Sequence, residues 1–156
     1  MIALFLALSL FTYDRSDPGW SHGLTEIGRI HNAGGRLGAW IADVMLLAFG
    51  MSAYWWVVLG GAVVWWGFHR IEIDEVRDRR SYAVVAIGFA VVLVASCGLE
   101  AIRLYSLKAT LPQAPGGMLG AVFGGALAQA LGFMGATLIL LVLLAGLVAF
   151  VSWKGT

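Results

Sequence analysis

Residues 82–102, YAVVAIGFAVVLVASCGLEAI, decide the fold of this chain. The stretch has no charged residue before Glu100, and as a helix it covers about 31 Å, the thickness of the hydrocarbon core of a bilayer. Its length and its richness in Val and Ala predict a membrane-spanning helix. Further apolar stretches on both sides predict that the chain crosses the membrane more than once.

The composition of the whole chain agrees with this class. Hydrophobic residues make up 60% of the 156 residues and charged residues only 12%, and the mean hydropathy is +0.86. These values exclude an ordinary soluble domain and predict an integral membrane protein of the all-α class. The net charge of +1 gives no basic surface for nucleic acid. The single cysteine, Cys97, can form neither an intrachain disulfide nor a cysteine-based metal site.

The apolar stretch at residues 37–68 is too long for one straight crossing. It covers about 48 Å as a helix, more than a tilt of up to about 40° accommodates. Gly50 followed by Ser52, and the pair Gly60 and Gly61, are the candidate hinges, because glycine weakens a helix. We predict one bent helix.

The last apolar stretch, residues 118–153, is also too long, at about 54 Å. The run Gly132-Phe133-Met134-Gly135 divides it. We predict a short glycine-rich helix at residues 118–131 that lies at the membrane interface, followed by a spanning helix at 136–153.

Residues 1–13 cover only about 20 Å and have no basic start typical of a signal peptide. We expect them to be the outer end of a first helix whose beginning is missing. The predicted fold is therefore polytopic, with four transmembrane helices and one interfacial helix. Its segments are helix 1–13, loop 14–36, helix 37–68, loop 69–81, helix 82–102, loop 103–117, interfacial helix 118–131 and helix 136–153.

The basic residues do not fix the orientation. The loop at 14–36 holds three arginines and the shorter loop at 69–81 holds four, which favours the second loop as cytoplasmic. When the loop at 103–117 and the C-terminal residues are included, however, five basic residues fall on each side. The charge pattern leaves both orientations open.

Three stretches of sequence that contain polar residues resemble those of a known family. They are TYDRSDPGWSH at 12–22, NAGGRLGAWIAD at 32–43 and SLKATLPQAPGGMLG at 106–120. Together with the spacing of the apolar stretches, they resemble the N-terminal four-helix membrane domain of the FtsK/SpoIIIE family of bacterial DNA translocases. The resemblance covers essentially the whole chain.

The resemblance implies an orientation and a role. Both ends of the domain and the loop at 69–81 would be cytoplasmic, and the loops at 14–36 and 103–117 periplasmic. The chain would be a multi-pass anchor in the bacterial inner membrane at the division septum, with the lipid bilayer and other cell-division proteins as partners. The family's motor implies a homo-oligomer, expected to be a hexamer, in a system that couples division to chromosome segregation.

The chemistry of the family's motor does not carry over to these residues. No G-x-x-x-x-G-K-[ST] phosphate-binding motif occurs in the sequence, so we expect no catalysis, no cofactor and no metal here. ATP and Mg²⁺ are expected only for a motor domain, and DNA binding by these residues is not expected. The alternative from another class is a small transporter or channel subunit, because glycine-broken helices can line substrate sites.

Four charged residues near helix ends form one candidate structural site. Glu100 and Arg103 share a helix face, and under the four-helix topology they lie on the same membrane side as Arg36 and Asp43. We predict that these four residues form a paired cluster between the second and third helices at the periplasmic rim. The competing hypothesis is a proton or ion pathway, which usually needs further ionisable groups at mid-membrane.

Small residues recur at every fourth position before the last helix. The series is Gly116, Gly120, Gly124, Ala128, Gly132 and Ala136. Such a ridge lets helix backbones approach closely in a membrane and predicts a helix-packing or subunit interface. The alternative is a merely flexible, glycine-rich segment, since glycine is common in transmembrane helices.

The loop at 14–36 is a candidate contact surface. Asp17-Pro18-Gly19 is typical of a turn, and Trp20 after it suits the membrane interface. We expect an ordered periplasmic cap that contacts division proteins. His22 and His31, with Asp14, Asp17 and Glu26 nearby, match no zinc spacing, so we interpret them as solvated loop residues.

Overall fold

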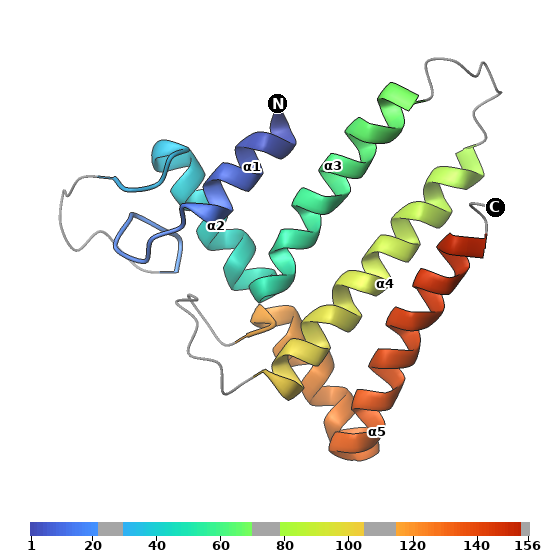
Figure 1. Cartoon of the computed structure of the whole chain (residues 1–156). Helices are drawn as coiled ribbons and strands as arrows, with labels where there is room; N and C mark the ends of the chain where they lie inside the picture. Colours follow the sequence, from blue (N-terminus) through green and yellow to red (C-terminus); the bar gives the residue numbers. More distant parts are fainter. Residues whose placement is uncertain (22–29, 70–78, 105–114, 154–156) are drawn as a thin grey trace.

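A computed structural model describes residues 1–21, 30–69, 79–104 and 115–153 (Figure 1). The described residues are helical or irregular and contain no strand, which confirms the all-α prediction. The elements are α1 (Ile2–Phe11), α2 (Gly35–Phe49), the 3₁₀ turn η1 (Gly50–Ala53), α3 (Tyr54–His69), α4 (Arg79–Arg103) and α5 (Gly117–Trp153). α4 begins at Arg79 rather than at the predicted residue 82, and α5 is helical from Gly117 to Trp153 except at Gly132.

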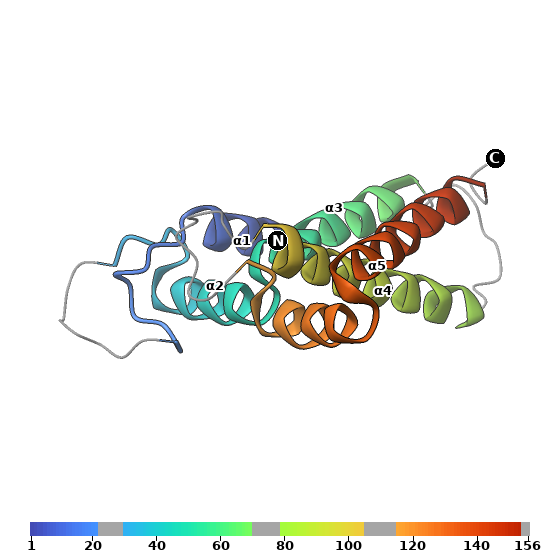
Figure 2. The ribbon, with the colours of Figure 1, turned by 90° about the horizontal axis from the view of Figure 1, so that it is seen from below.

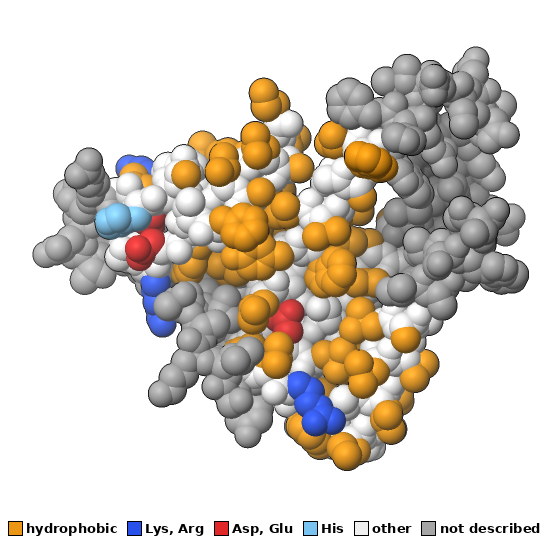
Figure 3. Space-filling model, viewed as in Figure 1, with side chains coloured by type: hydrophobic (Ala, Val, Ile, Leu, Met, Phe, Trp, Pro, Cys, Tyr) orange, Lys and Arg blue, Asp and Glu red, His pale blue; other side chains and the backbone are white. Residues whose placement is uncertain are grey.

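In the described part of the chain, three helical stretches are long and apolar enough to cross a membrane. They are Gly35–Trp65, Ala86–Arg103 and Gly117–Gly146, and the shorter α1 is also apolar. Hydrophobic side chains spread over the outward faces of the helices (Figure 3). A soluble monomer rarely exposes apolar surface on this scale, whereas a lipid-facing surface requires it.

The long second stretch turns sharply at Gly50, as the first of the two candidate hinges predicted. Gly50 has φ +61°, and α2 and α3 diverge from η1 as the two arms of a V (Figure 1). The second candidate hinge is wrong, because Gly60 and Gly61 lie inside the continuous helix α3. Gly60 instead permits close packing, since a Cβ there would lie 2.7 Å from the Cβ of Ala3 in α1.

The last long stretch breaks at Gly132, where the sequence predicted a division. Gly132 has φ +72° and ψ 168°, outside the helical region, and the two parts of α5 on either side of it run in different directions (Figure 1). The part after Gly132 packs back along α4, and its Ala136 and Leu140 are buried there. The interfacial depth predicted for residues 118–131 stays a prediction.

The described residues form two hydrophobic cores. Leu10, Ala42, Leu46 and Ala53 form the first core, which joins α1, α2 and the start of α3. Ala95, Ile102, Ala136 and Leu140 form the second core, between α4 and α5. α1, α2 and α3 form one helical unit around the first core, and α4 and α5 form a second unit around the second core. The two units meet where η1, α4 and the start of α5 come together.

The helix ends sort to two sides of the molecule. The start of α1, the end of α3, the start of α4 and the end of α5 lie on one side (Figure 1). Figure 2, a view from below, shows that the described residues connecting α1 to α2 project from one end of the molecule. This arrangement matches an even number of crossings with both ends of the domain on one side.

The hinge glycine gives a first prediction. We expect Gly50→Ala to lower the free energy of unfolding by about 2 kcal/mol or more. The backbone at this position has a positive φ, which alanine disfavours, and the added Cβ would clash with the backbone nitrogen of Gly116. Gly61→Ala is the matched control, because a Cβ at Gly61 meets no atom within 4 Å. Denaturant titration in detergent measures both, and equal stability of the two variants would contradict the structure.

Candidate functional site

The junction of the two helical units is built around the carboxyl group of Glu100 in α4. Its Oε1 lies 2.5 Å from the hydroxyl oxygen of Ser52 in η1, and its Oε2 accepts a hydrogen bond of 3.0 Å from the backbone N–H of Gly116. Glu100 is only 8% exposed. One buried side chain therefore ties η1, α4 and the start of α5 together, and we call this set of contacts the junction.

The hydrogen bonds of the junction continue to α3. Ser52 Oγ lies 2.7 Å from Ser96 Oγ, and the indole N–H of Trp55 donates to Ser96 Oγ at 3.2 Å. A hydroxyl has one proton and can also accept, so every group is satisfied when Trp55 donates to Ser96, Ser96 to Ser52 and Ser52 to Glu100. A fully satisfied polar network is what burial in a low-dielectric environment requires.

Glycine backbones close the same junction by direct contact. Gly50, Gly116 and Gly117 all have positive φ, at +61°, +85° and +60°. A Cβ on Gly50 would clash with the nitrogen of Gly116, and a Cβ on Gly117 would lie 2.6 Å from the nitrogen of Gly50. Only glycine allows both this backbone conformation and this approach.

The predicted small-residue ridge packs inside the chain. A Cβ on Gly116 or Gly120 would clash with the carbonyl oxygen of Cys97, and one on Gly124 would lie 2.9 Å from that of Gly98. Gly116, Gly120 and Gly124 are buried against α4. The structure therefore supports the helix-packing interpretation of Gly116, Gly120 and Gly124, with α4 of the same chain as the partner. Gly132 does not belong to the ridge, because it is exposed and non-helical and a Cβ there meets no atom within 4 Å.

The predicted cluster of Arg36, Asp43, Glu100 and Arg103 is wrong in its pairing. Among the described residues, no ion pair joins Arg36 to Asp43 or Arg103 to Glu100. The bend at Gly50 is the reason, because it brings Ser52 rather than Asp43 beside Glu100. Arg36 is exposed near the start of α2, and Asp43 is buried two turns further along.

Arg103 turns away from Glu100 although the two share a helix face. Its guanidinium lies 4.6 Å from the centre of the Phe133 ring, and its Nη2 lies 3.7 Å from the sulfur of Met134. Both partners follow the break at Gly132, so Arg103 connects the end of α4 to the bend of α5. This cation–π contact was not predicted, because it depends on the direction of the chain after Gly132.

Asp43 in α2 binds both ends of the polar segment 13–21, which follows α1. It accepts hydrogen bonds from the hydroxyl of Tyr13 at 3.1 Å, from the backbone N–H of Ser21 at 2.7 Å and from the hydroxyl of Ser21 at 2.8 Å. Burial, and then the nearby Asp43 carboxylate, raise the pKa of the Tyr13 phenol. Asp43 is thus a structural acceptor that fixes the end of α1 and residue 21 on α2.

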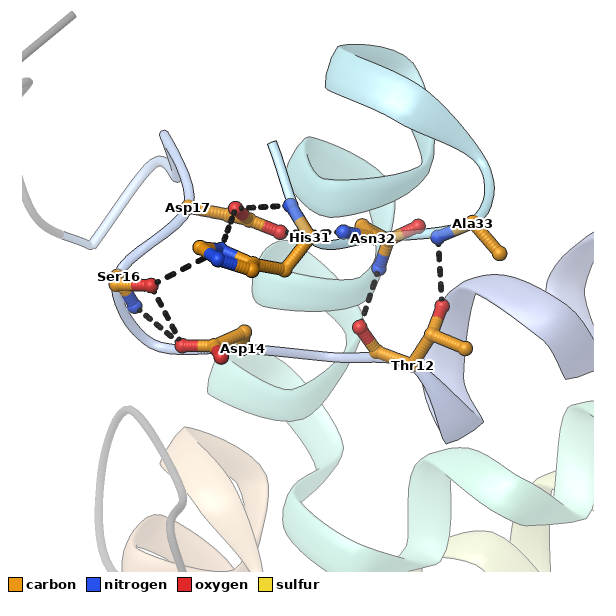
Figure 4. A network of polar contacts seen from close by, with 7 residues as sticks. All are labelled: Thr12, Asp14, Ser16, Asp17, His31, Asn32 and Ala33. Carbon is orange, nitrogen blue, oxygen red and sulfur yellow. Dashed lines mark hydrogen bonds and ion pairs between the residues drawn. The ribbon is translucent and has the colours of Figure 1, made fainter. Parts of the chain in front are cut away.

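A second network closes the base of this polar segment (Figure 4). Asp17 is buried and accepts from the backbone N–H groups of His31 at 2.8 Å and Asn32 at 2.7 Å. Asn32 in turn donates to the carbonyl oxygen of Ser9 at 2.8 Å. Thr12 accepts from the backbone N–H of Ala33 at 2.9 Å. We call the described residues 12–21 and 30–34, held by these bonds, the corner.

The turn in the corner differs from the predicted one. The backbone N–H of Asp17 donates to the carbonyl oxygen of Asp14 at 3.2 Å, so the turn lies before Pro18 rather than across Pro18 and Gly19. Asp14 accepts from the backbone and the hydroxyl of Ser16, and these bonds lower the pKa of the Asp14 carboxyl. The turn forms here because the Asp14 carboxyl accepts from the backbone N–H of the residue two positions on, as an Asx turn does.

The surface of the corner carries an aromatic pair. Trp20 is 69% exposed and meets the ring of Trp40, on α2, edge to face at a centroid distance of 6.3 Å. Within the described ranges, no group of three or more His, Cys, Asp or Glu residues could hold a metal ion. His22 and Glu26, which were considered as metal ligands in the sequence analysis, lie outside the described residues.

The apolar helices, the buried polar junction and the polar corner together define a polytopic α-helical membrane domain. Residues 1–155 match the family described as the 4TM region of DNA translocase FtsK/SpoIIIE. The chain belongs to this family, and it is a membrane domain of the FtsK type.

Curated relatives agree with the family match. The chain is 48% identical over 139 residues to DNA translocase FtsK 2 of Ralstonia nicotianae, covering 86% of this chain and 18% of the relative. It is 34% identical to DNA translocase FtsK of Pseudomonas syringae pv. syringae, covering 97% of this chain and 19% of the relative. It is 33% identical to DNA translocase FtsK of Vibrio vulnificus, covering 100% of this chain and 16% of the relative.

The chain therefore spans less than a fifth of the length of these relatives. No solved structure matches the chain.

The junction gives a second prediction, tested by a double-mutant cycle. We expect Ser52→Ala and Glu100→Gln to be coupled by about 1–2 kcal/mol in unfolding free energy, because Ser52→Ala removes the buried hydrogen bond whose acceptor Glu100→Gln changes from a carboxyl group to an amide. Thr137→Ala is the control partner for Ser52→Ala, because the Thr137 hydroxyl donates to the carbonyl oxygen of Phe133 in its own helix, a bond separate from the Ser52–Glu100 bond, and its effect should add independently. Additive effects of Ser52→Ala and Glu100→Gln would contradict the network.

The contact of Tyr13 with Asp43 predicts a dependence of stability on alkaline pH. The folded-state pKa of Tyr13 is raised above the unfolded value of about 10, so its contribution is complete below about pH 10 and is lost as pH rises toward the folded-state value. We expect Tyr13→Phe to make the fall of unfolding free energy above pH 10 shallower than in the wild type. Asp43→Asn should reduce the same slope, and identical slopes in all three proteins would rule out the contact.

Proposed function

We propose that this chain is the non-catalytic membrane anchor and division-protein contact domain of a DNA translocase that couples cell division to chromosome segregation. Its family and its relatives, which are named DNA translocases, support the anchoring role. The observation that carries the contact role is the corner, a polar segment fixed on α1 and α2 with exposed tryptophans. No residue of this domain is assigned to catalysis, and ATP and Mg²⁺ belong to the motor.

The proposed orientation follows from where the helices end. We place the motor of the translocase after α5, in the cytoplasm, because the family implies that arrangement. The start of α1, the end of α3 and the start of α4 share that side (Figure 1). The opposite end, with the corner and the Glu100 junction, then faces the periplasm at the inner-membrane surface.

The corner suits a contact surface because it is polar, ordered by hydrogen bonds and aromatic at its edge. Trp20 and Trp40 expose large amphipathic rings, which are enriched both at membrane interfaces and in protein contacts. His31 in the corner and Arg36 near the start of α2 are also exposed and supply polar partners. A periplasmic segment of another division protein fits this chemistry.

The remaining parts of the proposal concern assembly. Subunits of the translocase would associate as a homo-oligomer, a hexamer if the motor sets the number. The ridge at Gly116, Gly120 and Gly124 is used against α4, so association would draw on other faces of the helices. The bilayer is the second partner, and DNA would be bound by the motor alone.

The fourth prediction tests the contact role in cells. A fluorescent full-length translocase that contains this domain should gather at division septa, and the double substitution Trp20→Ala and Trp40→Ala should reduce its septal fraction several-fold, because it removes the aromatic surface. Trp65→Ala is the control, since Trp65 is exposed to a similar degree on α3, away from the corner.

Membrane insertion and protein level are recorded for each variant, so that loss of the anchor is separated from loss of the contact. Septal gathering of the double variant at the wild-type level would overturn the contact role of the corner. Full-length protein that inserts normally yet never gathers at septa, even with all tryptophans present, would overturn the septal role itself.

A further inference from the structure

The bend of α5 encloses a groove against the end of α4. Its volume is about 240 Å³. The lining is mostly small and apolar, with Ala101, Ala121, Gly124, Gly125, Ala128 and the ring of Phe133. The neighbouring Val122 and Leu131 are exposed and apolar, so the groove opens on an apolar surface, which is suited to contact with lipid.

A cation lies at the end of this groove. Arg103 is exposed and stacks on Phe133, which itself lines the groove. Among the described residues, no carboxylate forms an ion pair with Arg103. Arg103 is also the last residue of α4, at the depth where a spanning helix reaches the lipid headgroups. The stacked ring holds the guanidinium in one orientation, which reduces the cost of ordering it on a ligand.

The shape and the charge together select the occupant. A transmembrane helix has a diameter of about 10–12 Å and cannot enter a groove of this volume, whereas a single hydrocarbon chain can. A planar guanidinium matches phosphate oxygens with two parallel hydrogen bonds. We propose that this groove binds one anionic phospholipid, with its phosphate on Arg103 and one acyl chain between α4 and the first part of α5.

The proposal gives the glycines of this segment two separate roles. Gly124 is buried against α4, where a side chain would meet the carbonyl oxygen of Gly98. Gly125 lies one residue on and lines the groove, and a Cβ there meets no atom within 4 Å. Gly125 therefore keeps the groove open, and it can be substituted without forcing the helices apart.

Two substitutions test the two ends of the site. Gly125→Leu fills the groove and should abolish lipid retention, whereas Gly146→Leu places the same side chain in open space on the later part of α5 and serves as the matched control. Arg103→Gln removes the charge and should weaken binding of the anionic lipid about tenfold, the effect of losing one charge-assisted hydrogen bond. Arg103→Lys keeps the charge without the planar fork and should restore part of the affinity.

The measurement is native mass spectrometry of the full 156-residue chain in detergent, titrated with phosphatidylglycerol or phosphatidylcholine. The wild type and Gly146→Leu should each retain one lipid and prefer phosphatidylglycerol, and Arg103→Gln should lose that preference. The melting temperature of each variant is recorded, and Arg103→Lys carries the test if Arg103→Gln does not fold. Equal binding of the two lipids by the wild type, or an unchanged preference in both Gly125→Leu and Arg103→Gln, would overturn the proposal.

Discussion

The close approach of two glycine backbones, at Gly50 and at Gly116–Gly117, is the constraint on which the rest of the domain depends. A break in a helix leaves backbone groups without intrahelical partners, and hydrocarbon offers none. Here the break is buried in protein, and Glu100 accepts from Gly116 on one side while it contacts Ser52 on the other. The bend is therefore tolerated because the start of α5 fills it, and the two hydrophobic cores are joined at the same place.

This junction links the corner to the last helix. Asp43 ties the corner to α2, α2 ends at Gly50, and Gly50 contacts the start of α5. A change in the angle between α2 and α3 would therefore alter the contact of Gly50 with Gly116 and Gly117. The part of α5 after Gly132 packs along α4 toward the side where we place the motor. The fold thus offers a continuous packed route from the proposed contact surface to the proposed motor side.

The sequence predicted the helices and their breaks well because hydropathy and glycine act locally. Residues 82–102, Gly50 and Gly132 could be identified without tertiary information. The partners of Glu100 and Arg103 could not, since they depend on which way the chain leaves Gly50 and Gly132. The roles of Asp17 and Asn32 in joining the corner could not be predicted, for a different reason. Their acceptor and donor roles join the two ends of the corner, and spacing along one segment does not reveal such bonds.

The broken helices also bear on the alternative of a transporter or channel subunit. In transporters, a broken helix exposes backbone groups to a substrate at mid-membrane. In the part of the chain that the structure describes, the Gly50 break is occupied by Gly116 and Gly117, and the Gly132 break lies beside Arg103 at the end of α4. Each break redirects a stretch of about 48–54 Å that a bilayer of about 30 Å could not hold straight. The same glycines that resemble a transport motif are therefore accounted for by length and packing, which is the requirement of an anchor.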